Sequence, residues 1–235
     1  MARTSHLSDN LALLRTETAR LLETAARLDD AALRRSTLCE GWSRAHVLSH
    51  IARNADALTN LTHWAVTGES TPMYASPESR DVDIENGARR AAAEIRADLL
   101  SSAQRFAASA EGLAGDPEQA EVEMRGGVVV AGGDLPTLRL REVVFHHVDL
   151  DAGYSFADAD AAFVRRSLAN AVGRVSARDG APPLSLRSDE GDTWTVAGGG
   201  QEVTGPQAAL LLWLSRGVGD GVRSDAVLPA LPAWG

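Results

Sequence analysis

The chain of 235 residues carries a formal net charge of −9, and 44% of its residues are hydrophobic against 23% charged, a balance typical of a soluble globular protein. The acidic balance argues against a surface that binds nucleic acid or an anionic membrane. All 23 residues counted as lysine or arginine are arginines, which excludes a lysine Schiff base, a pyridoxal-phosphate linkage and a P-loop lysine. Arginine must therefore bind any anionic substrate, and its planar guanidinium suits carboxylates.

Cysteine content and hydropathy indicate a compartment. Cys39 is the single cysteine, so we expect no internal disulfide and no Cys-x-x-Cys redox motif. We also expect no leader peptide and no membrane span, because no apolar run is long enough to cross a bilayer. These features predict a cytoplasmic protein in a reducing environment, without a membrane partner.

The first two thirds of the chain predict four helices. Apolar residues recur at helical spacing in each of them, Ser43 is a suitable N-cap for the second, and a glycine ends it. Between the second and third helices, prolines and serines predict a loop. The predicted elements are helices over about 8–28, 43–68, 84–113 and from Pro136 onward, a loop over 69–80 and a hairpin around paired glycines over 121–130.

The last third predicts a second, smaller domain. The boundary is expected near 153–158, which gives domains 1–153 and 154–235. Helices are predicted over about 159–175 and 206–215, and strands over 184–188 and 193–196. The predicted fold class is therefore α+β, with a helical domain followed by a small α/β domain.

The pattern with the strongest chemical meaning joins the second and fourth helices. Glu142 and His146 lie four residues apart, so both side chains project from one helix face, and His50 lies in or beside an apolar stripe. Two imidazoles and one carboxylate suit a catalytic zinc with an open coordination position, and bundles build such sites from facing helices. Taken alone, a single histidine is more often a hydrogen-bonded core residue and a Glu–His pair is common at the surface, so spacing leaves both interpretations open.

Two long segments carry a family resemblance. Residues 38–58, which include Gly41-Trp42-Ser43-Arg44-Ala45-His46, and residues 141–154, which include Phe145-His146-His147-Val148-Asp149-Leu150, resemble the mycothiol-dependent maleylpyruvate isomerase family, as does the ending over 228–234. The resemblance implies a DinB-like four-helix bundle with a His, Glu, His metal site, joined to a small C-terminal α/β domain. Carried over residue by residue, it assigns the metal-ligand roles to His50, Glu142 and His146.

Four further residues are candidates for binding the substrate. Tyr74 and Arg80 belong to the predicted loop, and Arg80-Asp81-Val82-Asp83-Ile84 resembles a loop motif of the isomerases; a solvated loop with a capping aspartate is equally consistent. The family resemblance also implies a catalytic arginine, the last residue of a Trp-Leu-x-Gly-Arg pattern. Here the order is Trp213-Leu214-Ser215-Arg216-Gly217, with glycine and arginine exchanged, so Arg216 is the candidate and Arg223 its rival. Either is also consistent with a cation at a helix C-terminus.

Five residues near these motifs have open roles. Trp42 is interpreted as a hydrophobic staple in preference to a pocket wall, and His46 as a partner of the ligands or an exposed side chain. Cys39 is expected to be a buried structural thiol. His147 points about 100° away from its neighbour in a helix and is expected at the surface or an interface. Asp149 is expected to form a structural salt bridge with Arg53 in preference to orienting a ligand.

The resemblance implies a reaction and two cofactors. A divalent metal, zinc or a metal that accepts the same ligands such as Ni, Co or Fe, would bind mycothiol as its thiolate. Addition of the thiolate to the cis double bond of maleylpyruvate, rotation and elimination would give fumarylpyruvate. The alternatives are a mycothiol S-transferase of the same architecture and, from a different class, a non-enzymatic ligand-binding module. The protein is expected to be a monomer or a small homo-oligomer.

Overall fold

The chain divides into two compact units. The computed structural model describes residues 7–76 and 78–232, and its internal contacts cluster into Met1–Gly153 and Tyr154–Gly235. The first unit is helical with one small hairpin, and the second combines helices with a three-stranded sheet. The predicted α+β class is confirmed. None of the helices in the described ranges is long and apolar enough to cross a membrane.

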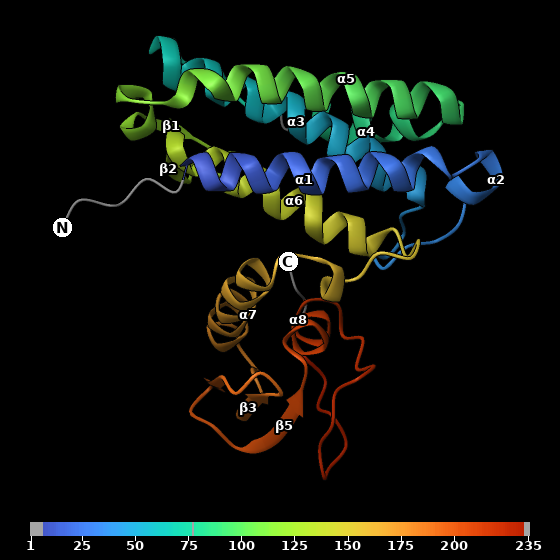
Figure 1. The fold of residues 1–235 in the computed structure, drawn as a ribbon, viewed down its shortest axis with the longest axis vertical. Helices are drawn as coiled ribbons and strands as arrows, with labels where there is room; N and C mark the ends of the chain where they lie inside the picture. The colour runs from blue at the N-terminus through green and yellow to red at the C-terminus, as the bar shows by residue number, and fades with distance from the viewer. Residues whose placement is uncertain (1–6, 77, 233–235) are drawn as a thin grey trace. The chain divides into compact units, whose positions relative to one another are not determined.

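Four long helices form the bundle of the first unit (Figure 1). They are α1 (Leu7–Ala26), α3 (Arg44–Thr67), α5 (Ala92–Ala110) and α6 (Leu135–Asp149). Helix α3 packs against both α5 and α6, and α1 packs against the same two helices. Apolar side chains at helical spacing fill the interior, among them Leu21, Ile51, Leu99 and Leu140, each at most 1% exposed. The predicted four-helix bundle is confirmed.

Helix α3 begins and ends at the residues that the sequence indicated. Ser43 is its N-cap, with an extended backbone, and the Ser43 N–H donates to Nδ1 of His46 at 3.3 Å. Gly68 ends the helix in the left-handed conformation at φ 75°, where a residue without Cβ is favoured, and its N–H donates to the Trp64 carbonyl. These caps fix which turn of α3 carries His50.

The predicted third helix is two helices. Helix α4 (Ser79–Ala88) is separate from α5, and the loop that was predicted to reach residue 80 ends at α4 instead. The helix is interrupted here because carboxylates cap the N-terminus of α5. Glu94 accepts from the Ala91 N–H at 3.1 Å, and Asp30 accepts from the Ala92 N–H at 2.8 Å. Asp30 lies 62 residues earlier in the chain, so helical periodicity alone does not reveal this cap.

Helix α4 lies unusually close to α3. A Cβ built on Gly87 would come within 2.0 Å of Ser49 Oγ, so only glycine permits this approach. The Ser49 hydroxyl donates to the Ile84 carbonyl at 3.0 Å, which joins the two helices. This contact holds α4 beside the turn of α3 that carries His50.

Shorter elements complete the first unit. The predicted hairpin is confirmed: β1 (Glu121–Glu123) pairs antiparallel with β2 (Val129–Ala131), and both glycines of its turn have positive φ. The remaining short elements are α2 (Asp30–Leu33), η1 (Glu111–Leu113), η2 (Asp116–Gln119) and η3 (Gly132–Asp134).

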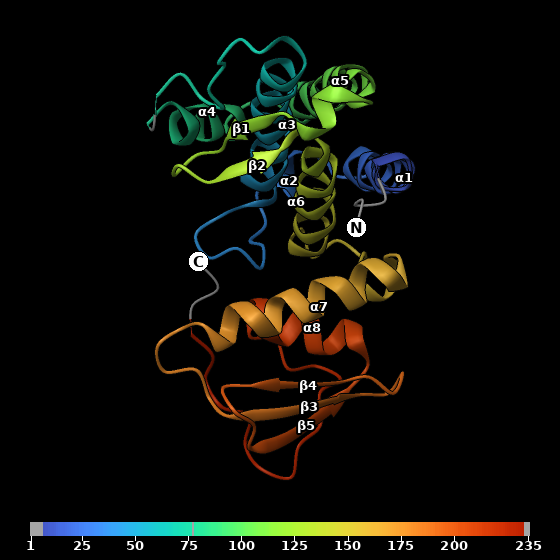
Figure 2. The same ribbon diagram turned by 90° about the vertical axis from the view of Figure 1, so that its left-hand side faces the viewer.

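The second unit is a three-stranded sheet with two helices on one face (Figure 2). Its elements are η4 (Phe156–Asp158), α7 (Ala161–Ser176), β3 (Leu184–Ser188), β4 (Thr193–Val196), β5 (Gln201–Gly205) and α8 (Gln207–Arg216). The strand order is β4-β3-β5, with β3 antiparallel to β4 and parallel to β5. The sequence prediction missed β5, because its short polar stretch follows three glycines and lacks strand periodicity.

Candidate metal centre

His50, Glu142 and His146 lie together inside the first unit. His50 comes from the second turn of α3, and the other two come from successive turns of α6. His50 Nε2 lies 3.0 Å from Oε2 of Glu142, and His146 Nε2 lies 3.5 Å from the same oxygen. One ligand atom from each residue lies within 4.8 Å of the others. The spacing of two helices predicted this cluster, and the structure brings its three members together.

The charges of the cluster follow from burial and hydrogen bonding. Burial lowers the pKa of His50 to about 4, so its imidazole is neutral. Burial acts to raise the pKa of Glu142, but hydrogen bonds from His146 and His50 outweigh it and hold that pKa well below its usual range. Burial acts to lower the pKa of His146, but hydrogen bonds with Asp149, Cys39 and Glu142 raise it well above its ordinary value. The centre therefore contains a neutral imidazole, a carboxylate and an imidazolium.

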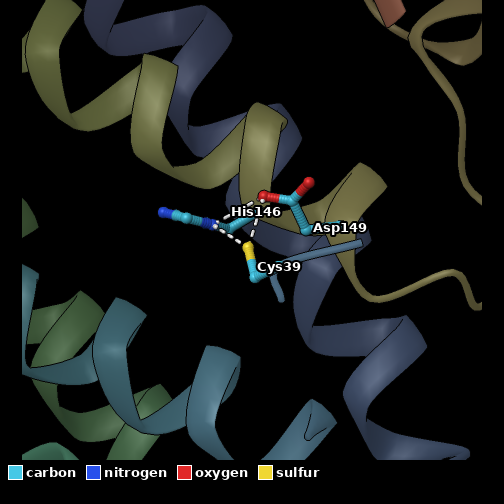
Figure 3. A group of neighbouring side chains, drawn as sticks. All are labelled: Cys39, His146 and Asp149. Atoms are coloured by element: carbon cyan, nitrogen blue, oxygen red, sulfur yellow. Dashed lines mark hydrogen bonds and ion pairs between the residues drawn. The ribbon is translucent and has the colours of Figure 1, made fainter. Parts of the chain in front are cut away.

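The far side of the His146 ring is held by Asp149 and Cys39 (Figure 3). His146 Nδ1 donates to Asp149 Oδ2 at 2.8 Å, and the Asp149 side chain is 0% exposed. The Cys39 thiol donates to the same oxygen at 3.2 Å. Of the two roles expected for Asp149, the structure favours orienting a ligand, because Arg53 pairs with Asp98 instead.

This arrangement fits a divalent metal. A metal-binding histidine normally donates its other N–H to a carboxylate or carbonyl, which fixes the tautomer and the ring orientation. His146 meets this requirement through Asp149, and its Nε2 then faces Glu142 and His50. Two imidazole nitrogens and a carboxylate oxygen are donors that zinc accepts, with a fourth position left for another ligand. A second group, Cys39, His146 and Asp149, also has ligand atoms close together, but it uses the opposite side of the His146 ring.

Arg80 and Tyr74 extend the centre. Arg80 lies in the first turn of α4, where its Nη1 binds Asp81 at 2.6 Å and its Nη2 donates to His50 Nδ1 at 3.4 Å. Burial raises the pKa of Tyr74, and the charge of Arg80 and a hydrogen bond with it act in the opposite direction. The two substrate-binding candidates thus contact each other, and Arg80 contacts His50.

Comparison with known proteins decides the family. A profile described as the mycothiol maleylpyruvate isomerase N-terminal domain matches residues 14–151. Two crystal structures, of a mycothiol-dependent maleylpyruvate isomerase and of its histidine-to-alanine variant, match with a TM-score of 0.89 at 31% and 32% identity, covering 99% of this chain and 100% of theirs. No curated protein sequence matched.

The chain belongs to the mycothiol-dependent maleylpyruvate isomerase family. The resemblance noted in residues 38–58 and 141–154 is therefore confirmed: the profile covers the first segment completely and the second as far as residue 151.

The arginine implied by this family lies in the second unit. Arg216 is the last residue of α8, and its Nη1 donates to the Ser215 carbonyl at 2.7 Å. Gly217 follows it in the left-handed conformation and ends the helix. Its rival Arg223 forms an ion pair with Asp189, and its backbone bridges Thr204. Arg223 thus has a structural partner of its own.

The structure settles three roles around the ligands that the sequence left open. Trp42 is a wall of the centre, since its ring centroid lies 5.4 Å from that of His50. His46 pairs with Glu85 of α4 at 3.1 Å. His147 was expected at the surface or at an interface, and the surface position is wrong. The residue is 1% exposed, and its Nε2 lies 2.8 Å from Oγ1 of Thr24 in α1.

Changing Asp149 to asparagine is expected to weaken zinc binding by about 10- to 100-fold, the cost of losing the partner of a metal-binding histidine. The amide would still fill the space, but the charge that orients His146 Nδ1–H would be gone. Asp151→Asn removes an exposed carboxylate just beyond the helix and is the control. Competition with a chelating dye measures affinity, and circular dichroism confirms folding; equal zinc affinity in both variants would contradict this role.

Zinc affinity is expected to rise about tenfold per pH unit from about pH 6.5 up to the raised pKa of His146. His50 is already neutral there and Glu142 already charged, so His146 is the ligand that must release a proton. Because its pKa is raised, protons compete with the metal throughout this window, and affinity levels off once the pH exceeds that pKa. Dye competition across the range measures the slope; a flat profile would mean that His146 is neutral without metal.

Proposed function

We propose that this protein is a mycothiol-dependent isomerase that converts maleylpyruvate to fumarylpyruvate. The observation that carries the proposal is the His50, Glu142 and His146 cluster, within a chain that matches such an isomerase over its full length. Arginine is the single residue type in this sequence whose side chain carries a permanent positive charge. Its guanidinium suits a substrate with two carboxylates.

We propose His50 Nε2, Glu142 and His146 Nε2 as the ligands of a divalent metal, with zinc the best fit to this donor set. Such a metal keeps a net positive charge and would favour the thiolate form of mycothiol, whose reversible addition lets the cis double bond of the substrate rotate. The protein's own residues hold this centre in place. Asp149 fixes the His146 ring, and the Trp42 ring lies against that of His50.

Arg80 is proposed to bind a carboxylate of the substrate. Its Nη2 donates to His50 Nδ1, which requires that the His50 proton lie on Nε2, where it faces Glu142. If Nε2 is a metal ligand, the proton must lie on Nδ1 instead, and two N–H groups then oppose each other. Nη2 of Arg80 would then lose its acceptor and be available to a substrate carboxylate beside the centre, while Nη1 keeps its pair with Asp81.

Arg216 is proposed to stabilise the negative charge that develops on the substrate carbonyl when the thiolate adds. Arg216→Ala is expected to lower kcat/KM by about 10²-fold, the effect of losing one such donor. Arg223→Ala is the matched variant and is expected to cost less than about threefold, because Arg223 is engaged with Asp189. Steady-state kinetics of both variants make the test, and the reverse order of effects would transfer the role to Arg223.

Product identity tests the proposed function. Protein, zinc and a tenth of an equivalent of mycothiol are incubated with maleylpyruvate and followed by proton NMR. An isomerase converts all of the substrate to fumarylpyruvate and leaves the thiol unchanged. A stable thiol adduct that stops at the amount of mycothiol would identify an S-transferase, and no thiol-dependent change would indicate a binding module.

We further propose a compartment, an assembly state and a division into domains for this protein. A thiol cofactor and a sequence with a single cysteine support a cytoplasmic location. We propose that 1–153 and 154–235 are separate domains, supported by the way contacts cluster, and that the protein acts as a monomer or small homo-oligomer.

A further inference from the structure

A groove of about 400 Å³ lies beside Tyr74, outside the metal centre. It is formed by the C-terminal part of α3, the loop that follows and the turn of the β1–β2 hairpin, all in the first unit. Its volume falls within the range of small-molecule sites. The hairpin and the loop are distant in sequence, so the groove exists only in the folded unit.

Contacts between these segments hold the groove in shape. The Arg125 N–H donates to the Met73 sulfur at 3.2 Å, which joins the hairpin turn to the loop. Asn60 Nδ2 donates to the carbonyls of Pro72 and Met73 at 3.3 and 3.4 Å, which joins the loop to α3. A groove fixed by such bonds loses little conformational entropy when a ligand binds.

The lining is mixed in a way that suits a polyhydroxylated ligand. Trp64 and Tyr74 supply aromatic rings, Ser70 and Ser76 supply hydroxyls, and Glu123 and Arg125 supply one acceptor and one donor of opposite charge. Aromatic rings offer flat apolar faces against which the C–H faces of sugar rings can pack. A lining with several hydrogen-bonding groups but balanced charge does not suit an acyl chain or a polyanion.

Tyr74 connects this groove to the metal centre. Its side chain lines the groove and also lies against Arg80, whose Nη2 reaches His50. Tyr74 and Arg80 therefore form a chain of contacts that leads from the groove to His50. A molecule long enough to follow this chain would place one end at the centre and the other in the groove.

We propose that the groove binds the carbohydrate end of mycothiol, an inositol linked to an aminosugar, while the cysteine end faces the metal centre. This inference rests on the proposed function for its choice of thiol. Trp64 packs against a sugar ring, and Arg125 and Glu123 hydrogen-bond to hydroxyl groups. The groove thereby selects mycothiol over small thiols that carry the same sulfur.

Two variants test the groove. Arg125→Ala removes an exposed donor, and Trp64→Leu removes the aromatic face while keeping an apolar side chain. Calorimetric titration of the zinc-loaded protein with mycothiol and with N-acetylcysteine gives the ratio of the two affinities. Each variant is expected to lower this ratio about tenfold, the effect of one hydrogen bond to a charged group or one aromatic contact. Arg105→Ala removes an exposed arginine that pairs with Asp56, outside the groove, and should leave the ratio unchanged.

The outcomes separate the groove from the function. Wild-type ratios in both groove variants of a protein that isomerises maleylpyruvate would overturn the groove and leave the function standing. Lowered ratios in a protein that binds mycothiol but does not isomerise maleylpyruvate would support the groove and overturn the function. Equal affinity of the wild-type protein for mycothiol and N-acetylcysteine would overturn the groove directly.

Discussion

Replacing His50 with alanine is expected to abolish zinc binding and thiol-dependent isomerisation together. His50 is 5% exposed, and it is the ligand that α3 contributes to a cluster whose other members both come from α6. Without it, two donors from one helix remain, which is too few for a catalytic zinc site. Losing the hydrogen-bond partner of a metal ligand can lower metal affinity by about 100-fold, and losing the ligand itself should lower zinc affinity by more than that. Zinc content and turnover are measured on the same preparation.

His63→Ala is the matched control for this change. His63 lies on the same helix, its side chain is 51% exposed, and it takes no part in the cluster. It should retain wild-type zinc content and turnover. Full activity of a metal-free His50→Ala protein would contradict the assignment of His50 and the need for a metal.

Replacing Arg80 with alanine is expected to lower kcat/KM by about 10²-fold while zinc content stays at the wild-type level. The guanidinium is not a metal ligand, but it is the cation beside His50 and is proposed to bind a substrate carboxylate. Arg80→Lys should recover only part of the loss, because an ammonium lacks the planar fork that pairs with Asp81 and a substrate carboxylate at once. Steady-state kinetics, with zinc content measured in parallel, report the effect.

Arg89→Ala provides the comparison for Arg80. Arg89 follows the same helix, is exposed, and forms an ion pair with Glu85. Its loss removes the same charge at a surface position and should change kcat/KM by less than about threefold. An Arg80→Ala enzyme as active as Arg89→Ala would remove Arg80 from the substrate site.

The helical parts of the site were predictable from sequence because their signals are local. The i, i+4 spacing of Glu142 and His146 fixes their common face, and the Ser43 cap fixes the turn that carries His50. Bringing these faces together requires the family resemblance or the structure. Spacing alone was equally consistent with a surface pair and a core histidine.

What the sequence did not reveal depends on contacts between distant residues. The break before α5 depends on a cap from Asp30, and the role of Asp149 depends on which partner it meets in space. His147 is buried because α1 supplies Thr24 opposite it. The groove beside Tyr74 joins α3 to a hairpin turn about 60 residues further along the chain, so no local pattern encodes it.

The most direct test of the central claim is the ultraviolet absorbance change of maleylpyruvate incubated with zinc-loaded protein, with and without mycothiol. We predict conversion to fumarylpyruvate when both zinc and mycothiol are present. We predict no conversion when mycothiol is omitted or when the metal is removed. Conversion at the same rate without mycothiol or without metal, or no conversion with both bound, would contradict the account.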